Sequence, residues 1–277
     1  MLRHDNTSSH FLPNENIDII MAWYTAVFLG LVQGLAEFLP ISSSGHLLLL
    51  ESCFGITEGG LLLTVLLHLA TLLAVVVVYR QRLWQLIRHP WNRETARLVL
   101  ATVITCVIVL IFHDVIERLF TLSALPYAFI GAGVYLLLPT VLGWWQKKSP
   151  VVKTGHDWCS VVAMGIAQGV AVVPGLSRSG LTITTGRLTG MSATEATDFS
   201  FLMSIPIIVA SLLYELLHGG NIQTLGISNI VLAFSTAFVA GIVAIKVMLD
   251  LTRKIDLRWF AYYLLLLGTG LLISSWC

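Results

Sequence analysis

Long runs of apolar residues dominate the chain and alternate with short polar connections. Two apolar regions, 21–56 and 156–190, are interrupted by Gly, Pro and Ser, which favour turns. Six uninterrupted runs have the length of about 17–25 residues that a helix needs to cross a bilayer. These runs cover residues 61–79, 96–113, 126–145, 199–217, 229–249 and 259–276. The pattern predicts an all-α polytopic membrane protein with six transmembrane helices and two re-entrant helix pairs.

The composition agrees with a chain whose main solvent is lipid. Charged residues make up 11% and hydrophobic residues 56% of the 277 residues, whereas a soluble domain has about 25% charged residues. The net charge of +1 gives no indication of a nucleic-acid partner. We expect a polar tail at 1–20, or an extension upstream of a start at Met21, followed by one membrane-embedded domain at 21–277.

Lys and Arg are concentrated in three connections, which predicts the orientation of the helices. Basic connections stay in the cytoplasm, so the region 21–56 is expected to open outward and the region 156–190 inward. The three connections hold eleven of the 16 basic residues. They are Arg80, Arg82, Arg88, Arg93, Arg97, Lys147, Lys148, Lys153, Arg253, Lys254 and Arg258.

The two interrupted regions are similar to each other when the chain is shifted by 135 residues. Residues 30–45 then align without a gap to residues 165–180, and seven of sixteen positions are identical. Each copy is followed by three predicted spans, and an odd number of crossings reverses direction. We therefore predict an inverted-topology repeat with halves at about 21–150 and 156–277. Chance similarity between Gly-rich apolar segments is the alternative.

The first copy carries a carboxylate and a cluster of hydroxyl groups. Gln33 and Glu37 are four residues apart and share a face of a helix. Pro40 is expected to end this helix, and the following serines and glycine to begin the next. Backbone N–H groups at a helix start favour phosphate. The polar residues of this helix start are Ser42, Ser43, Ser44 and His46.

The second copy offers the same helix start with a guanidinium in place of the carboxylate. Arg178 lies among Ser177, Ser179 and Thr182, and its planar fork can donate two parallel hydrogen bonds to a phosphate. If the two turns face each other, they hold a phosphate-sized anion from both sides.

Each of these residues also has a purely structural interpretation. Glu37 can be an interfacial carboxylate, Arg178 can pair with Asp198, and the serines can cap helices. His68 lies inside a predicted span and is interpreted as a packing residue. An ionisable group at membrane depth, however, costs about 2.5–3.5 kcal/mol or more. We therefore expect Glu37 and Arg178 to serve a function.

From Met21 onward the chain resembles the bacitracin-resistance family of undecaprenyl-diphosphate phosphatases. The resemblance rests on Gln33-xxx-Glu37, on the string from Pro40 to His46, and on the string from Pro174 to Thr182. It implies removal of the terminal phosphate of undecaprenyl diphosphate, which recycles the lipid carrier for peptidoglycan and other envelope polymers. It also implies a divalent cation, bacitracin resistance on overproduction, and a site in the bacterial inner membrane that opens to the periplasm.

Roles for the motif residues follow as a hypothesis. Glu37 and Gln33 hold Mg²⁺ or Ca²⁺ against the diphosphate, since these cations prefer oxygen ligands. Arg178 clamps the phosphoryl oxygens, together with the hydroxyl groups of both copies. Ser43 is the candidate nucleophile and His46 its proton acceptor, or the acid for the leaving group. Attack by a metal-activated water stays open.

Two other functional classes share some of these sequence features. Type-2 phosphatidic acid phosphatases need a His shortly after Ser-Arg, but residues 180–186 contain none, so that class is excluded. A transporter or flippase of a polyprenyl phosphate fits inverted repeats and has no need of Ser43 beside His46. The expected partners are the lipid substrate and the surrounding membrane lipids, and a homodimer stays open.

Overall fold

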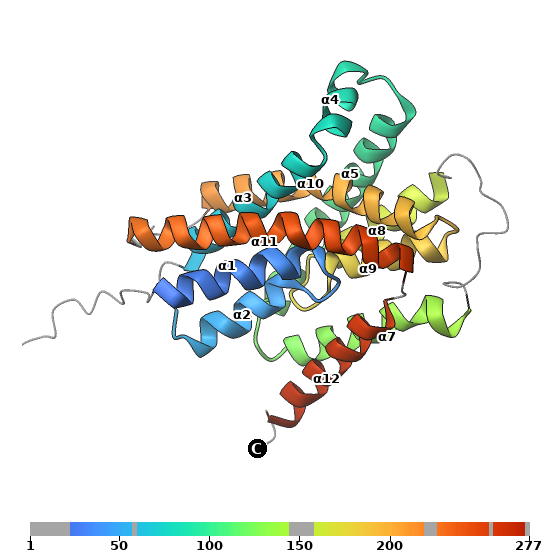
Figure 1. Cartoon of the computed structure of the whole chain (residues 1–277). Helices are drawn as coiled ribbons and strands as arrows, with labels where there is room; N and C mark the ends of the chain where they lie inside the picture. Colours follow the sequence, from blue (N-terminus) through green and yellow to red (C-terminus); the bar gives the residue numbers. More distant parts are fainter. Residues whose placement is uncertain (1–22, 57–59, 144–157, 219–225, 255–256, 275–277) are drawn as a thin grey trace, which may run out of the picture.

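The computed structural model describes residues 23–56, 60–143, 158–218, 226–254 and 257–274 (Figure 1). Within these ranges the chain forms twelve α-helices and no strand. The helices are α1 (Trp23–Phe38), α2 (Ser43–Cys53), α3 (Gly60–Val78), α4 (Arg80–Arg88), α5 (Arg93–Ile111), α6 (His113–Leu119), α7 (Leu125–Val141), α8 (Trp158–Val170), α9 (Arg178–Leu188), α10 (Ala193–His218), α11 (Ile227–Lys254) and α12 (Arg258–Ser274).

Each of the six long apolar runs contains one helix, namely α3, α5, α7, α10, α11 and α12 in chain order. Three of them, α5, α10 and α11, are long and apolar enough to cross a membrane, and α3 with α4 makes a fourth span if their 77° bend is included. The chain is therefore a multi-pass membrane protein. The expected tail at 1–20 and the basic residues Lys147, Lys148 and Lys153 lie outside the described residues.

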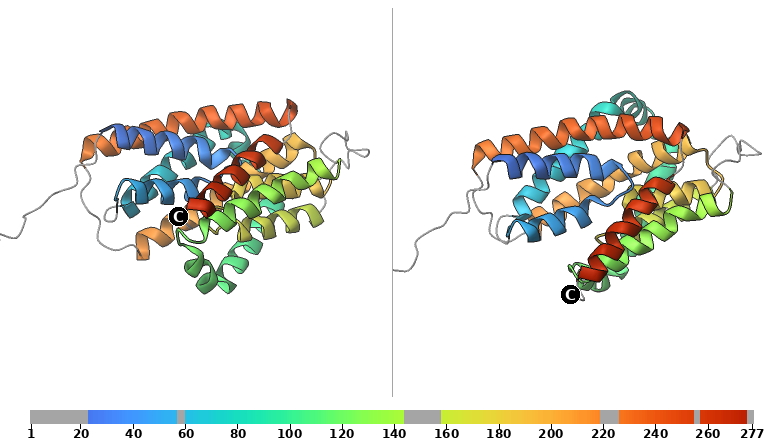
Figure 2. Two further views of the ribbon diagram at one scale, coloured as in Figure 1. Left: turned by 90° about the horizontal axis from the view of Figure 1, so that it is seen from below. Right: turned by 60° about the horizontal axis from the view of Figure 1, so that its bottom comes forward.

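Three closely packed helix pairs each combine one helix from the first half of the chain with one from the second half. Helix α1 packs along α11, α8 packs along α5, and α7 packs along α12. Helix α3 contacts both α10 and α11. In the turned views, α7 and α12 lie side by side (Figure 2).

Glycines that align when the sequence is shifted by 135 residues allow close contacts in two of these pairs. A Cβ atom on Gly34 of α1 would lie 2.5 Å from the carbonyl oxygen of Ala237 in α11. A Cβ atom on Gly169 of α8 would lie 2.8 Å from Cβ of Ile108 in α5. Small residues spaced by four let membrane helices approach in this way, so both broken regions are held against a long helix of the other half.

Both broken regions have the predicted form of two short helices around a polar turn. The turn between α1 and α2 covers residues 39–42, and the turn between α8 and α9 covers residues 171–177. Ser42 caps α2 by accepting from the N–H of Gly45 at 3.4 Å, and Ser177 caps α9 by accepting from the N–H of Gly180 at 3.1 Å. The two caps occupy equivalent positions of the repeat.

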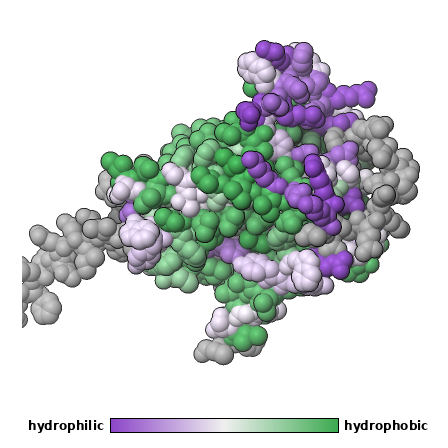
Figure 3. All heavy atoms as spheres, in the orientation of Figure 1, coloured by the Kyte–Doolittle hydropathy of each residue, from purple (hydrophilic) through white to green (hydrophobic). Residues whose placement is uncertain are grey.

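The visible surface agrees with a membrane location. Hydrophobic side chains cover the body of the molecule, and hydrophilic ones gather around α4 (Figure 3). Many large apolar side chains on the outer faces are exposed, among them Leu110, Leu217 and Leu266. Exposed apolar surface of this extent marks contact with a partner or a membrane.

Candidate active site

The two polar turns contact each other inside the helical bundle, as the sequence led us to expect. The N–H of Gly175 donates to Oγ of Ser42 at 3.1 Å, and Oγ of Ser179 donates to the carbonyl oxygen of Leu39 at 3.1 Å. Ser42 also has a φ of 69°, a backbone conformation that non-glycine residues rarely adopt. Such strain persists only where the surrounding structure over-determines it, and here the Ser42 hydroxyl joins two helix starts.

Glu37, at the end of α1, is the centre of the site. Its carboxylate is buried and accepts from Nε2 of Gln33 at 3.1 Å and from Oγ of Ser43 at 2.6 Å. Arg178 at the start of α9 forms an ion pair with the same carboxylate. Gln33 and Glu37 share a helix face, as predicted, and are also hydrogen-bonded to each other. The Glu37–Arg178 ion pair, which is largely buried, joins the two halves of the chain.

Arg178 retains one donor group that faces no acceptor. Its Nη2 contacts Glu37, whereas Nη1 is buried without a hydrogen-bond partner among the described residues. Because a buried donor is normally satisfied, an unpaired guanidinium N–H indicates a place for an anionic oxygen. The alternative pairing with Asp198 is wrong, since Asp198 accepts from the hydroxyl of Tyr79 at 2.7 Å.

His46 and Ser43 do not form the expected pair. Nδ1 of His46 faces the carbonyl oxygen of Ser42 at 2.7 Å, and Nε2 lies 2.6 Å from the hydroxyl of Tyr263 on α12. A carbonyl oxygen only accepts, so Nδ1 carries the proton of the neutral ring and Nε2 accepts from Tyr263. Ser43 donates to Glu37 instead, because the two residues face each other across the turn.

The other hydroxyl groups of the predicted site lie in different surroundings. Ser177 and Ser179 are buried, with their hydroxyl oxygens 3.4 Å apart. Thr182 faces α10, where its hydroxyl lies 2.6 Å from that of Ser200. Ser44 is half-buried, and its side chain has no hydrogen bond to another described residue. Ser44, Ser177 and Ser179 therefore lie at the starts of α2 and α9, next to the turns. Thr182 instead contacts α10.

Two residues of the site were missed by sequence reasoning. His68, interpreted as a packing residue, places Nε2 3.9 Å from the Glu37 carboxylate. Tyr263 reaches His46 from a helix more than 200 positions away, and the two rings stack with centroids 5.7 Å apart. The only sequence signal for His68 was its ionisable side chain at membrane depth. Nothing local signals Tyr263.

The chemistry of the donor set fits a hard divalent cation. Oε1 of Gln33 is buried without a hydrogen-bond partner among the described residues, while Nε2 of the same amide donates to the carboxylate of Glu37. Amide and carboxylate oxygens are the ligands that Mg²⁺ and Ca²⁺ prefer. No cluster of three or more His, Cys, Asp or Glu occurs in the described part of the chain. A cation held by Glu37 and Gln33 would need further oxygen ligands from outside this pair.

Comparison with known proteins identifies the family of the chain. Residues 26–270 match the model of the family described as bacitracin resistance protein BacA. An undecaprenyl-diphosphatase of Carboxydothermus hydrogenoformans is 38% identical over 255 residues, which cover 90% of this chain and 96% of that protein. An undecaprenyl-diphosphatase of Christiangramia forsetii is 35% identical, with 91% and 98% covered. Because the family match spans nearly the whole chain, the protein belongs to the bacitracin resistance protein BacA family.

Proposed function

We propose that the protein hydrolyses undecaprenyl diphosphate to undecaprenyl phosphate and inorganic phosphate, recycles the lipid carrier for peptidoglycan and other envelope polymers, and so confers bacitracin resistance. The observation that carries the proposal is the contact of Glu37 with Arg178 between the two polar turns. Ionisable side chains at membrane depth are energetically costly, so a buried pair of this kind indicates a site that binds a charged ligand. The similarity to undecaprenyl-diphosphatases supports the same reaction.

Head-group binding rests on the unpaired Nη1 of Arg178 and on the starts of α2 and α9. A terminal diphosphate carries about two to three negative charges near neutral pH, since its last pKa is near 6. Arg178 offsets one charge, and the helix starts add N–H groups that favour anions. The hydroxyls of Ser42, Ser44, Ser177 and Ser179 complete the proposed substrate contacts. Thr182 is not among them, because its hydroxyl faces Ser200 on α10.

The remaining negative charge calls for a divalent cation, Mg²⁺ or Ca²⁺. Glu37 and Gln33 would hold it through their side-chain oxygens, and it would supply charge neutralisation and polarise a phosphoryl oxygen. Gln33 brings no charge of its own, so Glu37 is the one charged ligand that the protein contributes.

Ser43 is the proposed nucleophile, and the geometry favours Glu37 as the group that accepts its proton. The Ser43 hydroxyl already donates to Glu37 at 2.6 Å, within the range needed for proton transfer. Attack of Oγ on the terminal phosphorus breaks the bond to the bridging oxygen and releases the prenyl phosphate. Water then cleaves the phosphoserine to inorganic phosphate, and the proton held by Glu37 returns to Oγ of Ser43. His46 is the proposed acid for the leaving group, and for this role its Nε2, which accepts from Tyr263 in the neutral ring, first takes up a proton from solvent. Direct attack by a water molecule is the alternative.

The finer membrane arrangement is part of the proposal. Six spans and two re-entrant pairs, α1–α2 and α8–α9, form an inverted repeat in the bacterial inner membrane, with the basic connections in the cytoplasm and the site open to the periplasm. The packing of α1 on α11 and of α8 on α5 supports the repeat. In the proposed repeat α1 corresponds to α8 and α5 to α11, so the two contacts are equivalent. A homodimer stays a prediction.

Phosphate release from undecaprenyl diphosphate by the purified protein in detergent tests the reaction. We expect release in the presence of Mg²⁺ or Ca²⁺ and a loss of at least about a hundred-fold in Glu37→Gln, because a group that contacts the reacting centre is removed. Glu94→Gln, which alters an exposed ion pair with Arg82 on α4, is the matched control. Normal release by Glu37→Gln would refute the assignment.

A polyprenyl-phosphate flippase is the second candidate, favoured by the exchanged packing of the two halves. It predicts no phosphate release in detergent, but transfer of a labelled polyprenyl phosphate between the leaflets of reconstituted vesicles. The two assays on one preparation separate the candidates.

A further inference from the structure

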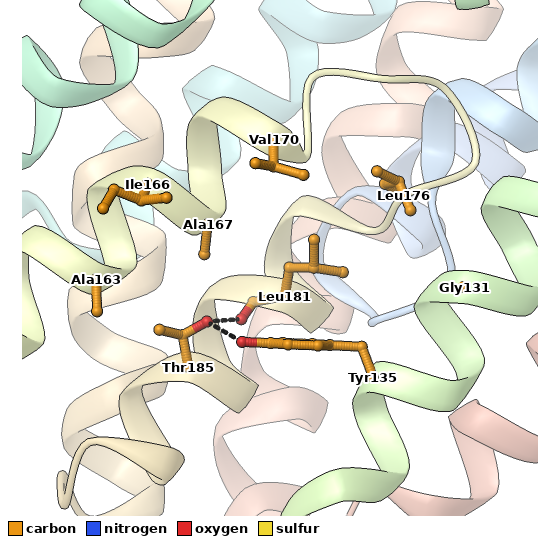
Figure 4. A pocket seen from close by; sticks show the side chains of 9 residues that line it. All are labelled: Gly131, Tyr135, Ala163, Ile166, Ala167, Val170, Leu176, Leu181 and Thr185. Carbon is orange, nitrogen blue, oxygen red and sulfur yellow. Dashed lines mark hydrogen bonds between the residues drawn. The ribbon is translucent and has the colours of Figure 1, made fainter.

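A cavity of about 520 Å³ lies between α7, α8 and α9, beside the turn that carries Arg178. Ala163, Ile166, Ala167 and Val170 line it along α8 (Figure 4). Ligand pockets of drug-sized molecules have volumes of about 300–1,000 Å³. The cavity therefore has room for a sizeable apolar group.

The lining leads directly to the proposed head-group site. Leu176 and Leu181 line the cavity, and they immediately precede Ser177 and Thr182 in the chain. At this helix start Arg178 contacts Glu37, whereas Leu176 and Leu181 line the cavity. A ligand with a charged head and an apolar chain matches this division.

The few polar groups of the cavity satisfy one another. The hydroxyl of Thr185 donates to the carbonyl oxygen of Leu181 at 2.7 Å and lies 2.9 Å from the hydroxyl of Tyr135 (Figure 4). Both hydroxyl protons are then used, because Thr185 accepts from Tyr135. The cavity therefore offers a bound molecule no free hydroxyl donor, which favours a hydrocarbon over water or a polar ligand.

The cavity is also open on the outer side of the bundle. Ile166 and Val170 are each 46% exposed, and a Cβ atom on Gly131 of α7 would meet nothing within 4 Å. In a membrane this side faces the acyl chains. A long chain can therefore enter sideways and continue into the lipid while its first units stay in the cavity.

We propose that this cavity binds the isoprene units of the substrate that lie next to its diphosphate. The inference rests on the proposed function and adds to it a binding site for the lipid chain. Selectivity for a prenyl chain then comes from α7, α8 and α9, separately from the charged residues that bind the head group. Each buried methylene contributes about 0.8 kcal/mol, so even a short prenyl chain gains affinity there.

Gly131→Phe tests the site by adding a ring at the cavity wall, where a Cβ atom would meet nothing within 4 Å. The readout is the ratio of kcat/KM for farnesyl diphosphate to kcat/KM for dimethylallyl diphosphate. We expect this ratio to fall about ten-fold or more, because excluding two methylenes from the cavity has that effect. Gly270→Phe on α12, where the space is equally open, is the control and should leave the ratio within about two-fold of the wild type.

A second measurement does not depend on turnover. Gly131→Cys is alkylated with a hydrophobic maleimide and followed by mass spectrometry of its peptide. Farnesyl diphosphate should slow the alkylation, and inorganic diphosphate should not. Equal protection by both compounds, or an unchanged chain-length ratio in Gly131→Phe, would overturn the cavity assignment. If the wild type releases phosphate from neither substrate while farnesyl diphosphate still protects, the hydrolytic function fails and the binding site stands.

Discussion

The helical bundle largely shields Glu37 and Arg178 from solvent. The charged form of each side chain is therefore stabilised by the opposite charge of the other. Side-chain exposure is 6% for Glu37 and 15% for Arg178. Removing one partner of a buried pair leaves an uncompensated charge and costs about 3–5 kcal/mol. An exposed pair such as Arg82 with Glu94 contributes about 1 kcal/mol or less.

The first prediction is a non-additive effect on stability. Glu37→Gln and Arg178→Ala should each lower the unfolding temperature in detergent clearly, while the double variant should lose less than the sum of the two, because its site holds no orphaned charge. Arg82→Ala with Glu94→Gln is the exposed control pair. Strict additivity at the buried pair would contradict the ion pair.

A second prediction concerns Gln33. Gln33→Glu should lower the Mg²⁺ concentration needed for half-maximal activity, since an added carboxylate tightens binding of a hard cation. Gln33→Ala should raise that concentration, because the buried, unpaired amide oxygen of Gln33 is lost. Titration of the metal-depleted protein measures both. An identical midpoint in all three proteins would show that Gln33 is no ligand.

A third prediction concerns the hydroxyl of Tyr263, which donates to His46. Tyr263→Phe keeps the ring stacking but removes a hydrogen bond worth about 0.5–1.5 kcal/mol. We expect kcat to fall about three- to ten-fold, with KM for the diphosphate changed much less. Tyr262→Phe on the same helix is the control, since the Tyr262 ring packs on Trp259, away from His46. Equal effects of the two variants would exclude a positioning role for Tyr263.

At the scale of elements, the close approach of the two turns depends on a missing side chain at Gly45. A Cβ atom there would lie 2.7 Å from the ring of Phe129 and 3.0 Å from Cα of Gly175. Overpacking of this kind costs about 1–3 kcal/mol. We expect Gly45→Ala to lower both thermal stability and phosphate release by moving the turns apart.

Gly270→Ala provides the matched comparison for Gly45→Ala. Its new methyl group would meet nothing within 4 Å, and alanine is about 1 kcal/mol better than glycine within a helix. The variant should therefore be as stable as the wild type or slightly more stable. Thermal unfolding of both variants in the same detergent decides, and a stable, fully active Gly45→Ala would contradict the close packing of the turns.

The long helices could be predicted from the sequence because their apolar runs are local features. The short helices α4 and α6 were not predicted, since α4 is rich in Arg and α6 is only 7 residues long. The meeting of the two turns followed from the internal repeat, which is a long-range signal within one sequence. His68 and Tyr263 carry no such signal, so their places beside Glu37 and His46 depended on how whole helices pack.

For the whole molecule, the proposed orientation makes a prediction about access from the two sides of the membrane. In a variant whose native cysteines are replaced by serine, Ser123→Cys should react with an impermeant maleimide on intact spheroplasts. Arg88→Cys should react only after lysis, since basic connections stay in the cytoplasm. Both positions are exposed, so accessibility within the protein does not limit labelling. The reverse pattern would invert the topology.

The charge pair also sets an order of events during biosynthesis. Glu37 and Arg178 are 141 positions apart, and ribosomes add about 5–20 residues per second. The nascent chain therefore carries the acidic turn for roughly 7–28 s before its basic counterpart is made. The translocon or the membrane surface has to accommodate the first hairpin during this interval. A chain truncated between the two turns has no counter-charge with which to complete the site.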